Sequence, residues 1–365
     1  MPTHYADRLA AACAARGTPA VVGIDPVLES LPPDLRPADG RLTTAVQSIE
    51  TFCRTVIERV APIVPAVKIN SGFFEAFYEP GVAAYYRLVA HAHACGLLVI
   101  GDIKRGDIGS TAKLYARGHL ADPTFSDITP DRIPDAVTLA GYLGRNAVGA
   151  FVEAARATGR GLYVLVRPSD PGADEVHEFG AGPRFYQHMA ALVRQWGDAA
   201  DLRGQTGLSC VGAVVAAKDA ASTAALRASL PHTPLLVPGY GAQGGTAEAC
   251  RACFLPGGTG AVVPWADRLW VVTYAAAPTG PRASSWPPAT SPPTWRASCN
   301  EDDRGHASRL GTTRRSRAAG CGRLRPRVAP PRRRAVRRHT HPRHRGYVRD
   351  RALGVGRARR AGAAA

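Results

Sequence analysis

The sequence has little lysine, no long apolar run and no ordered cysteine pattern. Four lysines, at positions 68, 104, 113 and 218, stand against 42 arginines. No segment is long and apolar enough to indicate a membrane span, and the first residues do not resemble a signal peptide. The eight cysteines show no framework spacing. This argues against a disulfide-stapled secreted domain and favours a reduced cytoplasmic protein.

The scarcity of lysine gives weight to the positions that keep it. Arginine holds its proton and spreads its charge over a planar group, whereas lysine carries a compact charge and can release a proton. Lys68 and Lys104 both lie at the ends of predicted strands. In so arginine-rich a chain, we interpret these two lysines as positions where arginine could not do the chemistry.

Acidic residues are scarce in the last quarter of the chain. Of the formal net charge of +17, residues 276–365 carry +18, from 22 arginines and four acidic residues, and residues 1–275 carry −1. The last quarter is rich in Pro, Ala, Gly and Ser and has no apolar periodicity, so we expect it to be disordered. The predicted division is a folded domain over 1–275 and a basic low-complexity tail over 276–365.

Two interpretations of this tail are open. A polycationic arm would bind nucleic acid or a membrane surface non-specifically through phosphate contacts. Alternatively, the segment is a GC-rich gene read out of frame, because such codons give mostly Arg, Pro, Ala and Gly. Basic and aromatic residues are not interleaved in the tail, and this composition favours the second interpretation.

Short apolar strands alternate with helical stretches along the first 263 residues. Eight strands that alternate with helices indicate a (β/α)₈ TIM barrel, with its active site at the carboxyl ends of the strands. A doubly wound sheet explains the alternation equally well but does not need eight strands. Helices are expected over 3–16 and 42–60, among others. The strands are expected at 20–24, 66–70, from 97, 136–139, 161–166, 211–216, 235–237 and 260–263.

The stretch Leu97–Thr111 places Asp102, Lys104 and Asp107 after a buried strand. On an extended backbone, Asp102 and Lys104 are two residues apart and therefore point the same way. An acid and a base at the end of a buried strand are costly unless they pair, and such groups are often functional. With Asp25 and Lys68 they form the candidate site, for which a structural ion-pair cluster is the alternative.

A glycine-rich loop follows the seventh predicted strand. Gly239, Gly241 and Gly244 match a G-x-G-x-x-G pattern, but no acidic residue ends the next strand to hold a ribose, so we reject a dinucleotide site. A glycine loop after strand seven that opens a helix near Thr246 is typical of a single phosphate bound by backbone amides. Gln243 could add a side-chain donor, and a tight turn without a ligand is the alternative.

Two further patterns are assigned no chemistry. Cys250 and Cys253 form a lone C-x-x-C on a predicted helix, with no second pair for a zinc site, and we expect them to pack within the fold. His91 and His93 lie two apart on a helix and face different ways, so we expect them to be solvated or packed. No metal site is expected.

These motifs together resemble the orotidine 5′-phosphate decarboxylase family, over about residues 3–263. The resemblance is carried by Asp25, Lys68, the Asp102-x-Lys-x-x-Asp element and the Pro-Gly-Tyr-Gly-x-Gln-Gly loop. Sugar-phosphate decarboxylases and aldolases of the same suprafamily share the Asp-x-Lys-x-x-Asp element. They carry an acidic metal ligand where this chain has Lys68, which points to the metal-free decarboxylase.

The closest resemblance is to the longer-chain subfamily, in which Phe73–Phe77 and Val166–Pro171 also have counterparts. It implies release of carbon dioxide from orotidine 5′-monophosphate to give uridine 5′-monophosphate, the last step of pyrimidine nucleotide synthesis, without metal or cofactor. Lys104 would stabilise the charge that develops at ring carbon 6 and then protonate that carbon. Asp102 would lie near the departing carboxylate and, with Lys68, fix the ammonium group.

The resemblance also implies a homodimer with shared active sites, in which Asp107 completes the network from the neighbouring subunit, with Ile108 and Thr111 beside it. The implied substrate contacts are of three kinds. Ribose hydroxyls would meet Asp25 and Lys68, the pyrimidine would meet Ser169, and the phosphate would meet Gly241 and Gln243.

The chain departs from the family pattern in two places. A phosphate-binding arginine is expected after strand eight, and Arg268 is near that place but out of register, within Pro264–Trp270. Tyr142 follows Ala-Gly, where relatives usually have Asn-Pro or Ser-Pro. Barrel closure depends on residues 264–275. The alternatives are a related sugar-phosphate decarboxylase or aldolase, or a catalytically silent barrel with a nucleic-acid-binding tail.

Overall fold

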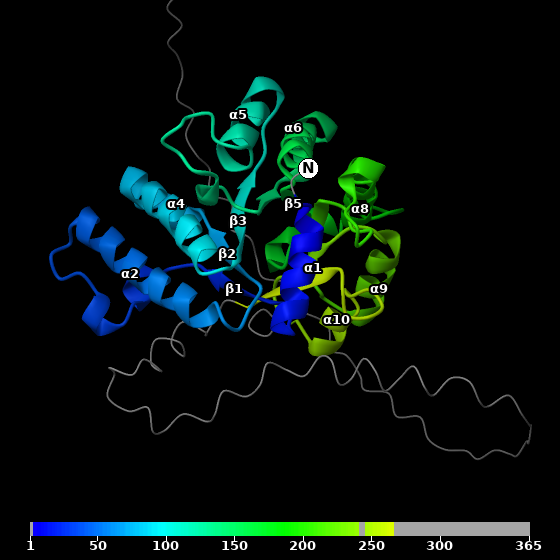
Figure 1. Ribbon diagram of the computed structural model, residues 1–365. Coiled ribbons are helices and arrows are strands. Elements are labelled where there is room, and N and C mark those ends of the chain that lie inside the picture. Colours follow the sequence, from blue (N-terminus) through cyan, green and yellow to red (C-terminus); the bar gives the residue numbers. More distant parts are fainter. Residues whose placement is uncertain (1–2, 241–244, 266–365) are drawn as a thin grey trace, which may run out of the picture. The chain divides into compact units, whose positions relative to one another are not determined.

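The structure is a computed structural model that describes residues 3–240 and 245–265. Eight parallel strands, ordered β1 to β8, close into a barrel surrounded by helices (Figure 1). This confirms the predicted TIM barrel and excludes the doubly wound sheet. The strands are β1 Ala20–Ile24, β2 Ala66–Asn70, β3 Leu98–Arg105, β4 Ala136–Leu139, β5 Gly161–Arg167, β6 Val211–Val215, β7 Leu235–Leu236 and β8 Ala261–Trp265.

Helices connect successive strands, as the alternation of the sequence predicts. Several bounds match the prediction closely, and the remaining differences are of a few residues at element ends. The α-helices are α1 Tyr5–Arg16, α2 Leu42–Val60, α3 Gly72–Glu75, α4 Tyr78–Ala94, α5 Gly109–His119, α6 Arg145–Thr158, α7 Asp174–His177, α8 Phe185–Trp196, α9 Ala220–Ser229 and α10 Ala247–Arg251. The 3₁₀ turns are η1 Leu28–Ser30, η2 Pro33–Leu35, η3 Pro130–Arg132, η4 Gly141–Leu143, η5 Pro171–Ala173 and η6 Ala200–Leu202.

Strand β8 closes the barrel. Val263 is in register with Ala20 of β1, and Val262 is in register with Leu236 of β7. The described part of residues 264–275, which is Pro264 and Trp265, already continues this strand. The predictions for Gly241, Gln243, Arg268, the tail over 276–365 and its out-of-frame origin fall outside the described residues.

The barrel interior begins as an apolar layer near the amino ends of the strands. Each strand contributes one buried residue to it: Val21, Ala66, Ile100, Ala136, Tyr163, Val214, Leu236 and Val262. A second core lies between the strands and the outer helices. Because side chains alternate along a strand, the positions two residues further on also face inward, toward the carboxyl end. These positions include Lys68, Asp102 and Thr138.

Helix α1 closes the amino end of the barrel. Tyr5 packs against Tyr163 edge to face at 6.1 Å between ring centroids, and their hydroxyls lie 3.2 Å apart. Gly161 permits this approach, since a Cβ there would lie 2.1 Å from the Tyr5 ring. The helix ends at Gly17, whose φ of +69° is the left-handed conformation typical of a helix C-terminus.

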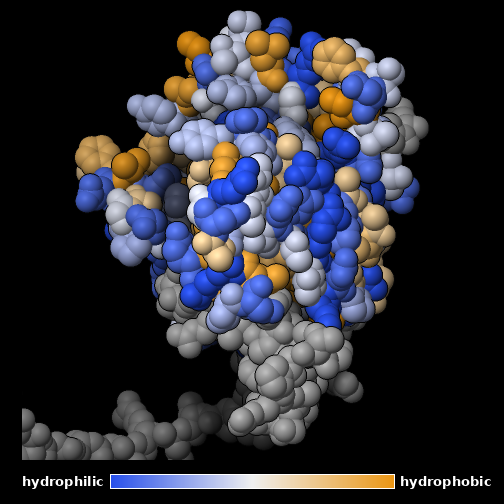
Figure 2. Space-filling model, turned by 90° about the vertical axis from the view of Figure 1, so that its left-hand side faces the viewer, coloured by the Kyte–Doolittle hydropathy of each residue, from blue (hydrophilic) through white to orange (hydrophobic). Residues whose placement is uncertain are grey.

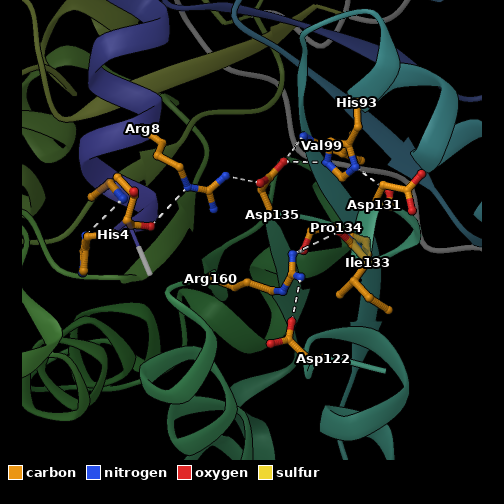
Figure 3. Close-up of polar contacts among 12 residues, drawn as sticks. His4, Arg8, His93, Val99, Asp122, Asp131, Ile133, Pro134, Asp135 and Arg160 are labelled. Carbon is orange, nitrogen blue, oxygen red and sulfur yellow. Dashed lines mark hydrogen bonds and ion pairs between the residues drawn. The ribbon is translucent and has the colours of Figure 1, made fainter. Parts of the chain in front are cut away.

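A buried carboxylate ties three elements together at this end (Figure 3). Asp135, which precedes β4, accepts hydrogen bonds from Arg8 of α1, from the backbone N of Val99 on β3 at 2.8 Å and from His93 of α4 at 2.9 Å. The sequence predicted a merely solvated or packed His93. That prediction was incomplete, because the carboxylate partner lies 42 residues further along the chain.

The outer surface is mostly hydrophilic on the face shown in Figure 2, and hydrophobic side chains gather toward its upper end. That is the end toward which β3 points in Figure 1. Large exposed apolar residues at the carboxyl ends of β3 and β4 include Ile108, Leu114 and Tyr142. Among the described helices, none has the length and apolar character that a membrane crossing needs.

Candidate active site

The charged residues selected from the sequence meet at the carboxyl end of the barrel. Lys68 Nζ lies 2.7 Å from Asp102 Oδ2, and Lys104 Nζ lies 2.6 Å from Asp102 Oδ1. Asp25, directly after β1, places its Oδ1 3.6 Å from Lys68 Nζ. We call Lys68, Asp102 and Lys104 the Lys-Asp-Lys unit.

Burial differs sharply within the Lys-Asp-Lys unit. Asp102 and Lys68 are buried, while the Lys104 side chain is 48% exposed. The unit therefore has an inner ion pair and an outer ammonium group that faces the barrel mouth. An ammonium at an open mouth, fixed by a buried carboxylate, is positioned to meet a ligand that enters from solvent.

Electrostatic interactions keep both Lys68 and Asp102 charged. Burial alone would raise the pKa of Asp102, but the ammonium groups of Lys68 and Lys104 lower it to about 2. Burial opposes the charge of Lys68 as well, and the carboxylates of Asp102 and Asp25 outweigh it and raise the Lys68 pKa. Burial also raises the pKa of Asp25, in spite of Lys68. Asp102 is thus an anion throughout the physiological range.

The backbone at Lys104 is not the extended strand that the sequence predicted. Lys104 has a φ of +46°, and the β3–β4 register jumps from Gly101↔Val137 to Arg105↔Leu139. Three residues of β3 therefore lie opposite one residue of β4, which makes a bulge. Asp102 and Lys104 do point to the same place, as predicted, but Lys104 reaches it through the bulge.

The residue opposite the bulge is Thr138, which the sequence analysis did not select. Its hydroxyl accepts a hydrogen bond from the backbone N of Lys104 at 3.0 Å and donates one to Asp102 Oδ1 at 2.8 Å. The available signal was its spacing of two residues from Ala136 in a predicted strand. That spacing places the hydroxyl inside the barrel beside β3.

In the described structure, the residues predicted to act across a subunit boundary make no ion pair or hydrogen bond with the Lys-Asp-Lys unit. Asp107 Oδ1 accepts a hydrogen bond from its neighbour Ile108 N at 2.7 Å. Ile108 is 62% exposed, and Thr111 is exposed on the first turn of α5. Ser169 is half-buried in the loop after β5.

A second charge cluster anchors the Ser169 loop. Arg167, at the end of β5, is buried and donates to Glu178 at 2.8 and 3.0 Å and to Ser222 Oγ at 2.9 Å. Its guanidinium also lies over the Tyr186 ring, 4.5 Å from the centroid. The sequence offered Arg167 only as part of a motif. In the structure, the contacts of Arg167 hold the loop that carries Ser169.

The glycine-rich loop is described at its two ends. Gly239 has a φ of +92°, and its carbonyl accepts a hydrogen bond from Gly245 N at 2.9 Å. Thr246 then caps α10 by accepting from Ala249 N at 3.2 Å. The two described ends of the loop are therefore hydrogen-bonded to each other and lead into α10, and the predicted phosphate contacts at Gly241 and Gln243 fall outside the described residues.

The Cys250–Cys253 pair packs as predicted. Both side chains are fully buried in the core between barrel and helices. Burial raises the pKa of both thiols, to about 11 for Cys250 and about 12 for Cys253. Thiols held neutral in this way are poor nucleophiles.

A cavity of about 980 Å³ lies at the opposite end of the barrel. Residues that precede strands line it, among them Pro19, Pro234 and Gly260, together with α1. Arg251 is the one charged side chain among its described lining residues. A cavity lined by one charged side chain does not provide the acid, base and charge that the carboxyl end provides.

Comparison with known proteins decides the family. The family model of orotidine 5′-phosphate decarboxylase / HUMPS matches residues 42–252. The chain belongs to the orotidine 5′-phosphate decarboxylase / HUMPS family. Lys68, Asp102, Lys104, Asp107 and Thr138 all fall inside the matched range.

Individual relatives agree with this membership. The chain is 39% identical over 265 residues to an orotidine 5′-phosphate decarboxylase from Rhodopirellula baltica, covering 71% of this chain and 85% of that protein. It is 36% identical over 269 residues to one from a Nocardioides species, covering 72% and 90%. A crystal structure from Streptomyces avermitilis, to which the same activity is ascribed, is 36% identical, covers 73% and 87% of the two chains and gives a TM-score of 0.60.

Proposed function

We propose that the chain converts orotidine 5′-monophosphate to uridine 5′-monophosphate and carbon dioxide, and that the Lys-Asp-Lys unit performs the reaction. The observation that carries the proposal is the pair of ammonium groups held within 2.7 Å of one buried carboxylate at the barrel mouth. Family membership supports the reaction itself. It also identifies the enzyme class as a carboxy-lyase of pyrimidine nucleotide synthesis, in agreement with the prediction from the sequence.

The Lys-Asp-Lys unit provides the charge and the proton donor that the reaction needs. The bond between ring carbon 6 and the carboxylate breaks, carbon dioxide leaves, and the electron pair remains on carbon 6. The Lys104 ammonium stabilises that pair electrostatically and then transfers its proton to carbon 6, so that Lys104 must regain a proton from solvent before the next turnover. Asp102 holds the ammonium in place and, as an anion, disfavours the substrate carboxylate more than the products.

Substrate binding uses the residues around the Lys-Asp-Lys unit. Asp25 Oδ1 is buried and lacks a hydrogen-bond donor among the described residues, and a ribose hydroxyl would supply one. Lys68 lies beside Asp25 and would bind a hydroxyl of the same ribose. Ser169 would contact the pyrimidine ring. Gly241 and Gln243 would bind the phosphate, with Arg268 as the arginine that the family pattern expects after strand eight.

A homodimer with shared sites accounts for the exposed residues beside the mouth. Ile108 and Leu114 are 62% and 65% exposed, and Tyr142 is 80% exposed. Apolar side chains gathered at one end of a barrel mark an association surface. A second copy seated there would bring Asp107, with Ile108 and Thr111, to its partner's Lys-Asp-Lys unit. We also place the enzyme in the cytoplasm, where its free cysteines stay reduced.

The related sugar-phosphate decarboxylases and aldolases are the alternative within the family. The Lys68 ammonium lies inside the barrel and binds Asp102, so a metal cation placed beside it would be repelled. The residues 276–365 are assigned no part in the reaction, whether they form a nucleic-acid-binding arm or an out-of-frame product. The nucleotide sequence around codons 260–275 distinguishes these origins.

Replacing Lys104 tests the proposed function. Lys104→Ala in the full chain should lower kcat for carbon dioxide release by roughly 1,000-fold or more, because it removes both the preorganised charge and the proton donor. Lys113→Ala, which removes an exposed lysine of α5, is the matched control and should leave kcat within about two-fold. Equal activity of the two variants would refute the assignment.

A further inference from the structure

Thr138 lies inside the barrel next to both Asp102 and Lys104. It is 1% exposed and lies on β4, two residues beyond the inward Ala136. Its hydroxyl contacts the backbone of Lys104 and the side chain of Asp102 at the same time, at 3.0 and 2.8 Å. Thr138 therefore joins the backbone that carries the proton donor to the carboxylate that holds it.

The chemistry of the groups fixes the direction of these two hydrogen bonds. A backbone N–H can only donate, so the Thr138 oxygen must accept from Lys104. The single hydroxyl proton is then free for Asp102 Oδ1, which as a carboxylate can only accept. The arrangement therefore needs a hydroxyl at this place, and an apolar side chain of the same shape cannot replace it.

The bulge explains why this hydroxyl matters. Asp102, Ile103 and Lys104 lie opposite Thr138 alone, so the Lys104 N–H bonds to a side chain where a regular ladder would use a backbone carbonyl. Lys104 also adopts a φ of +46°, a conformation that is strained for a residue with a Cβ and persists only where its surroundings impose it. The Thr138 hydroxyl is the side-chain contact that fixes this backbone.

We propose that Thr138 is a positioning residue of the reaction: its hydroxyl holds the Lys104 backbone in the bulge and, through Asp102, holds the Lys104 ammonium at the reacting carbon. The inference rests on the proposed function of the Lys-Asp-Lys unit. It assigns Thr138 no contact with the substrate. It predicts that losing the hydroxyl lowers turnover and leaves nucleotide binding nearly unchanged.

Thr138→Val and Thr138→Ser separate the hydroxyl from the packing. Valine keeps the β-branched shape and removes the hydroxyl, while serine keeps the hydroxyl and removes a methyl group. We expect kcat to fall about 10- to 100-fold in Thr138→Val, the size of a displacement of about 1 Å in a reacting group. Thr138→Ser should stay within about three-fold of wild type. The dissociation constant of uridine 5′-monophosphate should change less than about two-fold in both.

A merely structural role would give a different pattern. It would move kcat and nucleotide affinity together, or would move Thr138→Ser as much as Thr138→Val, and either result would overturn the proposal. If Thr138→Val does not fold, Thr138→Ala against Thr138→Ser still isolates the hydroxyl, because alanine and serine differ only in that group. Absence of turnover in wild type would count against the proposed function instead.

A crystal structure of Thr138→Val tests the positioning claim without any turnover. The proposal predicts that Lys104 leaves the left-handed region and that its Nζ moves out of hydrogen-bonding range of Asp102 Oδ1. Unchanged Lys104 geometry in that variant would contradict the proposal, whatever the reaction of the enzyme.

Discussion

At Asp102 three donors converge on one buried carboxylate. Lys68 Nζ, Lys104 Nζ and the Thr138 hydroxyl lie 2.6 to 2.8 Å from its two oxygens. Charge-assisted hydrogen bonds of this kind are strong, and they keep the carboxylate ionised where burial alone would neutralise it. The arrangement leaves the ammonium of Lys104 as the member that solvent and substrate can reach.

Removing the Lys68 ammonium should destabilise the fold, because it leaves a buried carboxylate without one of its partners. Lys68→Met keeps the length of the side chain and leaves the Asp102 and Asp25 carboxylates side by side with less counter-charge. We expect a loss of about 3–5 kcal/mol in the free energy of unfolding at pH 7. The loss should shrink toward pH 5 as a carboxyl takes up a proton. Urea unfolding at the two pH values measures both.

The double variant Lys68→Met/Asp102→Asn is the control for that experiment. It removes both partners of the buried pair, so most of the stability should return, while turnover should not. A single variant as stable as wild type at pH 7, or a double variant no more stable than the single one, would contradict the account of Asp102.

The residues of the site could be predicted from the sequence to different extents. Lys68 and Asp102 followed from strand ends, charge and the scarcity of lysine. The positive φ of Lys104 could not be predicted, because nothing in Gly-Asp-Ile-Lys-Arg marks a bulge. Thr138 was missed because its importance depends on the register between β3 and β4, which the sequence of neither strand fixes.

Among the elements, the contact of α4 with the segment that precedes β4 depends on His93, which lies between two acceptors. Both ring nitrogens of His93 face acceptors, the Asp135 carboxylate and the Asp131 carbonyl (Figure 3). A ring that donates from both nitrogens is an imidazolium. Although burial and Arg160 disfavour this charge, Asp135 and the Asp131 carbonyl raise the pKa of His93 above its ordinary 6.5.

The charge of His93 should make the folded protein less stable as the pH rises. Because the pKa of His93 is higher in the folded protein, its contribution is complete below about pH 6.5 and is lost as pH rises through the folded value. We expect wild type to lose stability between pH 6 and pH 8, as measured by urea unfolding. His93→Gln should lose less over the same interval.

The exposed His188 of α8 provides the control. His188→Gln should keep the wild-type dependence, because its ring is not held between acceptors in the described structure. If His93→Gln and His188→Gln show the same change between pH 6 and pH 8, His93 is not the group responsible.

Element positions could be predicted more fully than element contacts. The strands predicted at Ala66–Asn70 and Ala136–Leu139 have the observed bounds, because the β-branched and apolar residues of a buried parallel strand leave a clear signal. The link from His93 to Asp135 leaves no such signal, since it joins residues brought together only by barrel closure. The phosphate loop stays a prediction at Gly241 and Gln243.

At the scale of the whole molecule, the proposed active site combines residues from two copies of the chain. Among the described residues, Asp107 makes no ion pair with the Lys-Asp-Lys unit of its own subunit and bonds to the backbone of the exposed Ile108. If each active site takes Lys104 from one subunit and Asp107 from the other, two inactive variants can form a mixed dimer with one intact site. A monomeric enzyme could not regain activity in this way.

Mixing Lys104→Ala with Asp107→Ala, under conditions that let subunits exchange, is the most direct test. Each variant alone should be nearly inactive. In a mixed dimer one site carries both substitutions and the other carries neither, so random exchange should restore roughly a quarter of wild-type carbon dioxide release. Activity that stays at the level of the separate variants after proven exchange would contradict the shared Lys-Asp-Lys-Asp site.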